Sequence, residues 1–124
     1  MTTPNRLTAY RNPNDYSADH EQFRETVRAF ATREIAPHAN EWDEAGGFPR
    51  ELYRKASQAG LLGLGYPEEY GGTPCDIFYK LILSEELARG GAGGVCASLM
   101  SHTIGSPPIL AAGSAAMKQR VLPA

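Results

Sequence analysis

The first third of the chain carries a helical pattern of apolar residues. Positions three or four residues apart are apolar and charged residues lie between them, which is the period of an amphipathic helix. The apolar positions are Phe23, Val27, Phe30, Ala31 and Ile35. Ser17 or Asp19 is a suitable N-cap for this helix. Pro37 has no backbone N–H and therefore predicts a kink or an end, after which the pattern resumes through Trp42.

A second helix is predicted after the glycine pair at 46–47. Pro49 suits its first position and Gly60 suits a left-handed cap at its end. The apolar stripe between them consists of Leu52, Ala56 and Ala59. The segment 67–72, Pro-Glu-Glu-Tyr-Gly-Gly, has the composition of a loop.

The third predicted helix, residues 76–89, is apolar on more than one face. Its apolar residues are Ile77, Phe78, Leu81, Ile82, Leu83, Leu87 and Ala88. A helix of this kind is buried, so we expect it at the centre of the fold. Arg89 lies at its C-terminal end, where the helix dipole favours a positive charge.

From Gly90 to Met117 the chain contains no Asp, Glu, Lys or Arg, although 21% of the sequence is charged. A glycine-rich turn at 90–94 precedes a predicted fourth helix at 95–104. The segment 105–108 ends in two prolines and predicts a break, because residues before proline avoid helical angles. A short apolar turn at 109–112 and a last helix capped by Ser114 follow. A charge-free stretch of this length is expected to be buried in protein or to line an apolar cavity.

These elements predict an all-α fold, a five- to six-helix orthogonal or up-down bundle. No segment alternates apolar and polar residues as a half-buried strand does. Residues 1–16, which are interrupted by Pro4 and Pro13, are predicted to form an N-terminal tail. Residues 17–124 are predicted to form one domain, which is the usual number for a chain of 124 residues.

Charge and composition exclude several kinds of partner. The net charge is −2 and no block of Lys or Arg is present, so we expect no nucleic-acid partner. Gly, Pro, Ser and His interrupt the charge-free stretch, so no run approaches the roughly 20 apolar residues of a membrane span. Cys75 and Cys96 match no metal-ligand spacing, which predicts no metal site and two reduced thiols in a cytoplasmic protein.

Several short motifs follow one another in a specific order along residues 15–124. They are Phe30-Ala31 with Glu34-Ile35-Ala36-Pro37, Phe48-Pro49 with Leu52, Gly60-Leu61-Leu62-Gly63, Pro67-Glu68-Glu69-Tyr70-Gly71-Gly72, Ser84-Glu85-Glu86-Leu87-Ala88-Arg89, Gly105, Pro108 and Gly113, and Lys118-Gln119 with Leu122-Pro123. Each motif is weak alone. As an ordered set they resemble the N-terminal helical domain of the acyl-CoA dehydrogenase family.

The resemblance implies α,β-dehydrogenation of an acyl-CoA thioester, with FAD as cofactor and a homotetramer as the complete assembly. In the family, a β-sheet domain and a second helical bundle follow this domain, and they carry the catalytic glutamate and most of the flavin site. No acidic residue of this chain matches that glutamate. We therefore expect no catalytic, cofactor-binding or metal-binding residue here, and neither FAD binding nor activity from the chain alone. The expected partners are the acyl-CoA substrate and the remaining domains.

In the family, the acyl chain lies in a dry slot between the base and the flavin, because water would weaken the base. The resemblance places the fourth helix and the break after it on the acyl side of this slot. The candidate lining residues are Val95, Cys96, Leu99, Met100, Thr103 and Ile104. Helical spacing puts them on different faces, which cannot all line the slot, so core packing is the alternative for each.

Three further features are interpreted as structural. His102 either lies near the thioester or is a hydrogen-bonded histidine without a catalytic role, and we prefer the second interpretation because no nucleophile or ligand accompanies it. Glu85 and Glu86 are interpreted as residues with a structural ion-pairing or helix-surface role rather than as a general base. The glycines of 90–94 follow no strand, so they form a turn rather than a dinucleotide motif.

Two other functions stay open from the sequence. One is a free-standing helical binding module that has the acyl-binding face without the chemistry. The other is the same domain of an acyl-CoA oxidase or a flavin monooxygenase, which resemble the dehydrogenases in this region. The length and branching of the acyl group are not set by the sequence.

Overall fold

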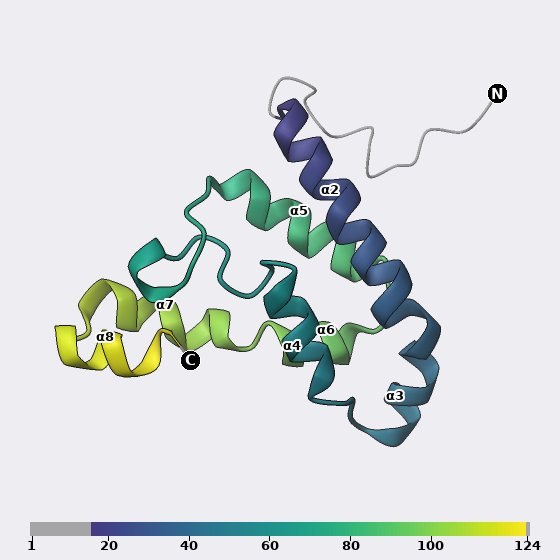
Figure 1. Cartoon of the computed structure of the whole chain (residues 1–124). Coiled ribbons are helices and arrows are strands. Elements are labelled where there is room, and N and C mark those ends of the chain that lie inside the picture. The colour runs from purple at the N-terminus through teal and green to yellow at the C-terminus, as the bar shows by residue number, and fades with distance from the viewer. Residues whose placement is uncertain (1–15, 124) are drawn as a thin grey trace.

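The computed structural model describes residues 16–123, and over this range the chain is all-α, as predicted (Figure 1). The α-helices are α2 (Ala18–Phe30), α3 (Ala39–Ala45), α4 (Glu51–Gln58), α5 (Ile77–Ala88), α6 (Gly93–Leu99), α7 (His102–Ala112) and α8 (Ala115–Val121). The described residues form no strand, and their one β-type contact is an isolated bridge between Leu64 and Thr73. Apart from Tyr16, the predicted N-terminal tail lies outside the described residues.

The first helix bends at the predicted proline without ending there. Ser17 caps α2, and its side chain accepts a hydrogen bond from the backbone N–H of His20. Pro37 cannot donate to the carbonyl four residues back, and the turns around it change their pairing. Ala31–Ile35 forms a π-helical turn and Ala36–His38 a 3₁₀ turn, after which α3 continues. If α2 through α3 is taken as one bent helix, the described chain has six helices, within the predicted range.

α5 packs lengthwise on α2, so the third helix forms one side of the core. It is not buried on every face, because Ile77 and Leu81 are 60% and 45% exposed. The core lies between these two helices, α4, α6 and the segment after α4. Its buried members are Val27, Phe30, Ile35, Leu52, Ala56, Leu61, Leu64, Leu83, Leu87, Ala92, Val95 and Leu99. The limits of α5 follow the prediction, since Asp76 caps its N-terminus and Arg89 is its C-cap residue.

A buried ionic cluster joins α2 to α5. The guanidinium of Arg24 donates to Glu85 at 2.6 Å and to Glu86 at 2.9 Å, and Arg28 donates to Glu86 at 2.9 Å. Burial acts to raise the pKa of Glu86, but hydrogen bonds from Arg28 and Arg24 outweigh it and hold that pKa below its usual value. Both glutamates are thus ion-pairing residues, as interpreted from the sequence.

The predicted fourth helix at 95–104 is wrong in its boundaries. α6 ends at Leu99, a turn occupies 100–101, and α7 begins at His102. The predicted break at 105–108 is also wrong, because Pro107 and Pro108 lie inside α7, which includes the predicted turn at 109–112. The carbonyls four residues before the prolines belong to Thr103 and Ile104, which are both exposed, so water can satisfy them.

The observed limits of α4 and α8 are closer to the predicted ones than those of α6 and α7. α4 begins at Glu51, after Pro49, and Gly60 adopts the predicted left-handed conformation with a φ of 78°. The 67–72 segment contains one 3₁₀ turn, η4 (Glu68–Tyr70). The side chain of Ser114 caps α8 by accepting from the N–H of Met117.

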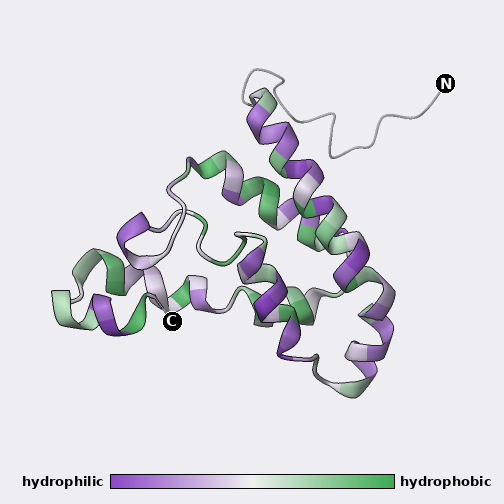
Figure 2. Ribbon diagram, in the orientation of Figure 1, coloured by the Kyte–Doolittle hydropathy of each residue, from purple (hydrophilic) through white to green (hydrophobic). Residues whose placement is uncertain are grey.

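α7 and α8 form an arm at one end of the molecule (Figure 1). Neither helix contains a buried residue. Figure 2 shows that α7 nevertheless carries hydrophobic residues. None of the helices formed by residues 16–123 is long and apolar enough to cross a membrane.

Candidate functional site

The elbow between α6 and α7 divides the charge-free stretch into an inward and an outward half. Val95 and Leu99 belong to the core, with 7% and 1% of their surfaces exposed. Cys96 and Met100 are half-buried and pack against that core. Four of the six candidate lining residues therefore hold α6 in place, at least in part.

The other two candidates, Thr103 and Ile104, lie on the exposed side of α7. Ile104 is 81% exposed, more than the other large exposed hydrophobic residues of the described chain. The hydroxyl of Thr103 donates to the carbonyl of Met100 at 2.6 Å, so it is used within the elbow. The exposed side of this part of α7 is consequently an apolar surface.

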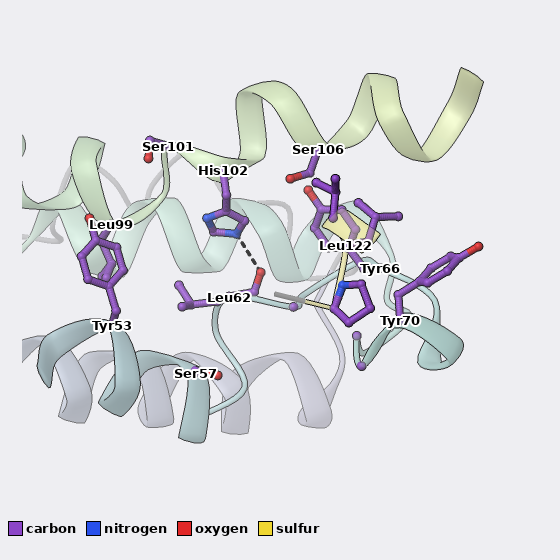
Figure 3. Close-up of a pocket in the computed structure, with 15 residues that line it drawn as sticks. Tyr53, Ser57, Leu62, Tyr66, Tyr70, Leu99, Ser101, His102, Ser106 and Leu122 are labelled. Atoms are coloured by element: carbon purple, nitrogen blue, oxygen red, sulfur yellow. Dashed lines mark hydrogen bonds between the residues drawn. The ribbon is translucent and has the colours of Figure 1, made fainter. Parts of the chain in front are cut away.

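A cavity of about 430 Å³ lies on the other side of the elbow, between α4, the 61–72 segment and the arm (Figure 3). This volume is within the range of small-molecule sites. Its lining residues are Tyr53, Ser57, Leu62, Gly63, Tyr66, Tyr70, Gly71, Gly72, Leu99, Ser101, His102, Ser106, Val121, Leu122 and Pro123. Leu99 is the one candidate from the sequence that lines it.

His102 joins the arm to the rest of the molecule. Its Nε2 donates to the carbonyl of Leu62 at 2.8 Å, as the dashed line in Figure 3 shows. No acidic side chain and no cysteine lines the cavity beside it. The histidine is therefore hydrogen-bonded, as the preferred interpretation expects, and its lack of a catalytic role stays a prediction.

The tyrosines of the cavity were missed as site residues by sequence reasoning. Tyr53 lies on α4 and Tyr66 lies in the segment after it, and no local pattern connects them. Tyr70 is part of the Pro-Glu-Glu-Tyr-Gly-Gly segment, whose composition indicates only a loop. The hydroxyl of Tyr53 donates to the carbonyl of Ser98 at 3.2 Å and so connects α4 to α6.

The two cysteines are free, half-buried thiols. Burial raises the pKa of the Cys96 thiol and of the Cys75 thiol. The Sγ of Cys96 donates to the carbonyl of Leu87 at 3.3 Å. Within residues 16–123 the structure contains no cluster of His, Cys, Asp or Glu that could hold a metal ion.

The residues present do not fit a bound FAD. A dinucleotide carries a pyrophosphate, which proteins bind with cationic side chains or with the N–H groups of a glycine-rich helix start that follows a strand. The cavity is lined by no Lys or Arg. The glycine-rich turn before α6 follows α5 and not a strand. The described residues therefore form an apolar surface and a neutral cavity, whose one histidine is hydrogen-bonded to a backbone carbonyl.

Comparison with known proteins decides the family. The sequence model of the acyl-CoA dehydrogenase N-terminal domain matches residues 17–124. This chain belongs to the acyl-CoA dehydrogenase family. The family is FAD-dependent in general.

Two curated acyl-CoA dehydrogenases illustrate the match. The mitochondrial long-chain specific acyl-CoA dehydrogenase of Sus scrofa is 40% identical over 89 residues, which are 72% of this chain and 21% of that protein. FadE25 of Mycobacterium tuberculosis, described as a probable acyl-CoA dehydrogenase, is 39% identical over 108 residues, 86% of this chain and 27% of its own length.

A solved structure shows the same fold. The acyl-CoA dehydrogenase of Geobacillus kaustophilus superimposes with a TM-score of 0.80 at 30% identity, covering 87% of this chain and 28% of that one. This acyl-CoA dehydrogenase chain thus spans about a quarter of the length of the relatives it matches.

Proposed function

We propose that this chain is the N-terminal domain of a flavin-dependent acyl-CoA dehydrogenase and forms the acyl-side wall of its substrate pocket. In this proposal residues 17–124 act as one domain. The remaining domains supply the flavin site and the base that starts α,β-dehydrogenation of an acyl-CoA. The complete enzyme is a homotetramer in the cytoplasm, and this chain alone binds no FAD and has no activity.

One observation carries the proposal: the charge-free α7 is exposed, although it belongs to a chain with an ordinary share of charge. An apolar helix face of this kind on a soluble protein marks a surface that another group covers. The family match makes the remaining domains and the acyl chain the natural occupants. The wall then consists of Met100, Thr103 and Ile104, while Val95 and Leu99 support it from the core.

The wall would act by excluding water. A carboxylate that removes an α-proton is a stronger base when its hydration is reduced. The hydroxyl of Thr103 already donates a hydrogen bond to the carbonyl of Met100, and Ile104 has no polar atom in its side chain. Neither residue brings water or charge to the reacting carbons.

A chimera tests the proposal. The corresponding domain of the Geobacillus kaustophilus enzyme is replaced by this chain, and bound flavin absorbance and acyl-CoA-dependent dye reduction are measured. We expect the chimera to bind FAD and to turn over acyl-CoA. The isolated chain should do neither, and purification of that chain with a yellow chromophore near a 1:1 ratio contradicts the proposal.

A matched pair of variants tests the wall itself. Ile104→Asp places an unpaired charge against the acyl chain and should raise KM for acyl-CoA at least about tenfold in the chimera. Ile77→Asp is the control, because Ile77 is also an exposed isoleucine, at the start of α5. Equal kinetics of the two variants, with FAD bound in both, would remove Ile104 from the wall.

A further inference from the structure

His20 occupies the place where the first turns of α2 and α5 meet. Only 8% of its surface is exposed. Three aromatic rings surround the imidazole: Tyr79 with its centroid at 4.4 Å, Phe78 at 5.9 Å and Tyr16 at 6.0 Å. Such packing restricts the ring to one orientation.

The hydrogen bonds of this ring determine its tautomer. The backbone N–H of Ser17 points to Nδ1 at 2.9 Å, and a backbone amide can only donate. Nδ1 also lies 2.9 Å from the Oγ of Ser17, a hydroxyl that can donate to it or accept from it. Because the N–H of Ser17 needs an acceptor, we assign Nδ1 as the unprotonated nitrogen. Nε2 carries the hydrogen and donates to the carboxylate of Asp76, with N–O distances of 2.9 and 3.0 Å.

The same carboxylate caps α5. Oδ1 of Asp76 accepts from the backbone N–H of Phe78 at 2.9 Å. On the other side, the side chain of Ser17 and the ring of His20 form the capping box of α2. One imidazole thereby connects the N-terminal caps of two helices that are 56 residues apart in the sequence.

We propose that His20 is a proton-operated clasp whose Nδ1 holds the backbone N–H of Ser17 when neutral and releases that N–H when protonated. Protonation converts Nδ1 from an acceptor into a donor, which then faces the N–H of Ser17, another donor. The bond from the Ser17 N–H, one of the two bonds of the α2 capping box, is lost. The new Nδ1–H then has the Oγ of Ser17, at 2.9 Å, as its acceptor. Nε2–H still donates to Asp76 in the imidazolium, so the α5 cap stays in place.

The charged groups around the ring do not change the loss of the hydrogen bond from the Ser17 N–H. The titratable and charged groups on the packed elements are Tyr16, Asp19, Glu21, Arg24, Asp76 and Tyr79. An Nδ1 that carries a hydrogen cannot accept from the N–H of Ser17, whatever the surrounding charges.

Amide exchange of the 124-residue chain tests the clasp by NMR. Protection factors for Ser17 and Phe78 are measured from about pH 8 to about pH 5, with correction for the intrinsic exchange rate, while imidazole nitrogen shifts report the protonation of His20. Protection of Ser17 should fall about fivefold as Nδ1 becomes protonated. Protection of Phe78 should stay constant.

His20→Gln separates the clasp from simple structural loss. Glutamine at this position can still accept from Ser17 in a capping box but does not titrate. Its Ser17 protection should therefore be independent of pH. The control is His38→Gln, since His38 stacks on Trp42 away from this junction, and it should keep the pH profile of the parent chain.

Three results overturn the clasp. The first is an Nδ1–H tautomer at neutral pH. The second is a Ser17 protection factor in the parent chain that does not change while His20 titrates. The third is a pH-dependent Ser17 protection that persists in folded His20→Gln.

Discussion

The body of the molecule, α2 through α6, and its arm, α7 with α8, use charge in opposite ways. In the body, even a fully buried carboxylate, that of Glu86, is held by Arg24 and Arg28. The arm exposes Ile104 to solvent and contains no charged residue before Lys118. The body pairs its buried carboxylate, although two buried nitrogens of Arg24 have no hydrogen-bond partner within the described chain and Ile77 of α5 is exposed. The arm has no buried residue and leaves an apolar surface uncovered. The difference indicates that the body folds around its own core, whereas the exposed apolar surface of the arm is suited to contact with another group.

The largest effect is expected from breaking the ionic cluster of the body. Glu86→Gln removes the charge that Arg24 pairs with and leaves the guanidinium partly uncompensated in the interior. We expect the free energy of unfolding in urea at neutral pH to fall by about 3–5 kcal/mol. Glu69→Gln, an exposed loop position, should change it by less than about 0.5 kcal/mol. Equal effects of the two variants would mean that the cluster does not stabilise the body.

A pair of apolar truncations compares the two regions directly. Leu99→Ala leaves a cavity in the core and should cost about 2–5 kcal/mol in urea unfolding. Ile104→Ala removes a side chain that is already in solvent and should cost less than about 0.5 kcal/mol. The order should reverse for acyl-CoA oxidation by the chimera, where Ile104 is proposed to face the acyl chain. Comparable losses of stability would show that the arm packs on the body in solution.

Acid should weaken the body through Glu86. The pKa of this carboxyl is lower in the folded chain than the roughly 4.3 of an unfolded glutamate. Its stabilising contribution is therefore complete above about pH 4.3 and is lost as the pH falls through the folded pKa. Urea midpoints measured at decreasing pH should fall less steeply in Glu86→Gln than in the parent chain.

Glu51→Gln is the control for the acid experiment. The hydrogen bond from Arg54 also lowers the pKa of Glu51, but this pair lies on the surface. Removal of the Glu51 charge should leave the acid slope, the fall of the urea midpoint with decreasing pH, nearly unchanged. An acid slope that depends on Glu51 and not on Glu86 would contradict the role given to the buried cluster.

The sequence predicted the elements whose ends are set by local chemistry. Ser17 and Ser114 cap their helices as expected, and Gly60 closes α4 in the left-handed conformation. The elbow at 100–101 escaped prediction because neither Met100 nor Ser101 is a helix-breaking residue. The proline pair led to a predicted break at 105–108, where α7 in fact continues. The exposed carbonyls in the first turns of α7 tolerate the missing N–H groups.

The candidate site was predictable only in part, because it depends on contacts between distant segments. Helical spacing showed that Val95 and Leu99 occupy a different face from some other candidates, but not which face is exposed. The cavity brings Tyr53 together with Tyr66 and Leu122, and no spacing rule connects these residues. Hydrogen bonds such as that between His102 and Leu62 fix this arrangement.

The smallest effect on global stability is expected from replacing the two prolines inside α7. Pro107→Ala with Pro108→Ala restores two N–H donors to the carbonyls of Thr103 and Ile104, and proline inside a helix is about 3 kcal/mol less favourable than alanine. We expect amide protection within α7 to rise while the urea midpoint of the body stays constant within about 0.5 kcal/mol. Ala111→Gly should lower α7 protection, again without moving the midpoint. A double-alanine variant that shifts the global midpoint would show that arm and body unfold as one cooperative unit, and the contrast between them would then be one of surface composition alone.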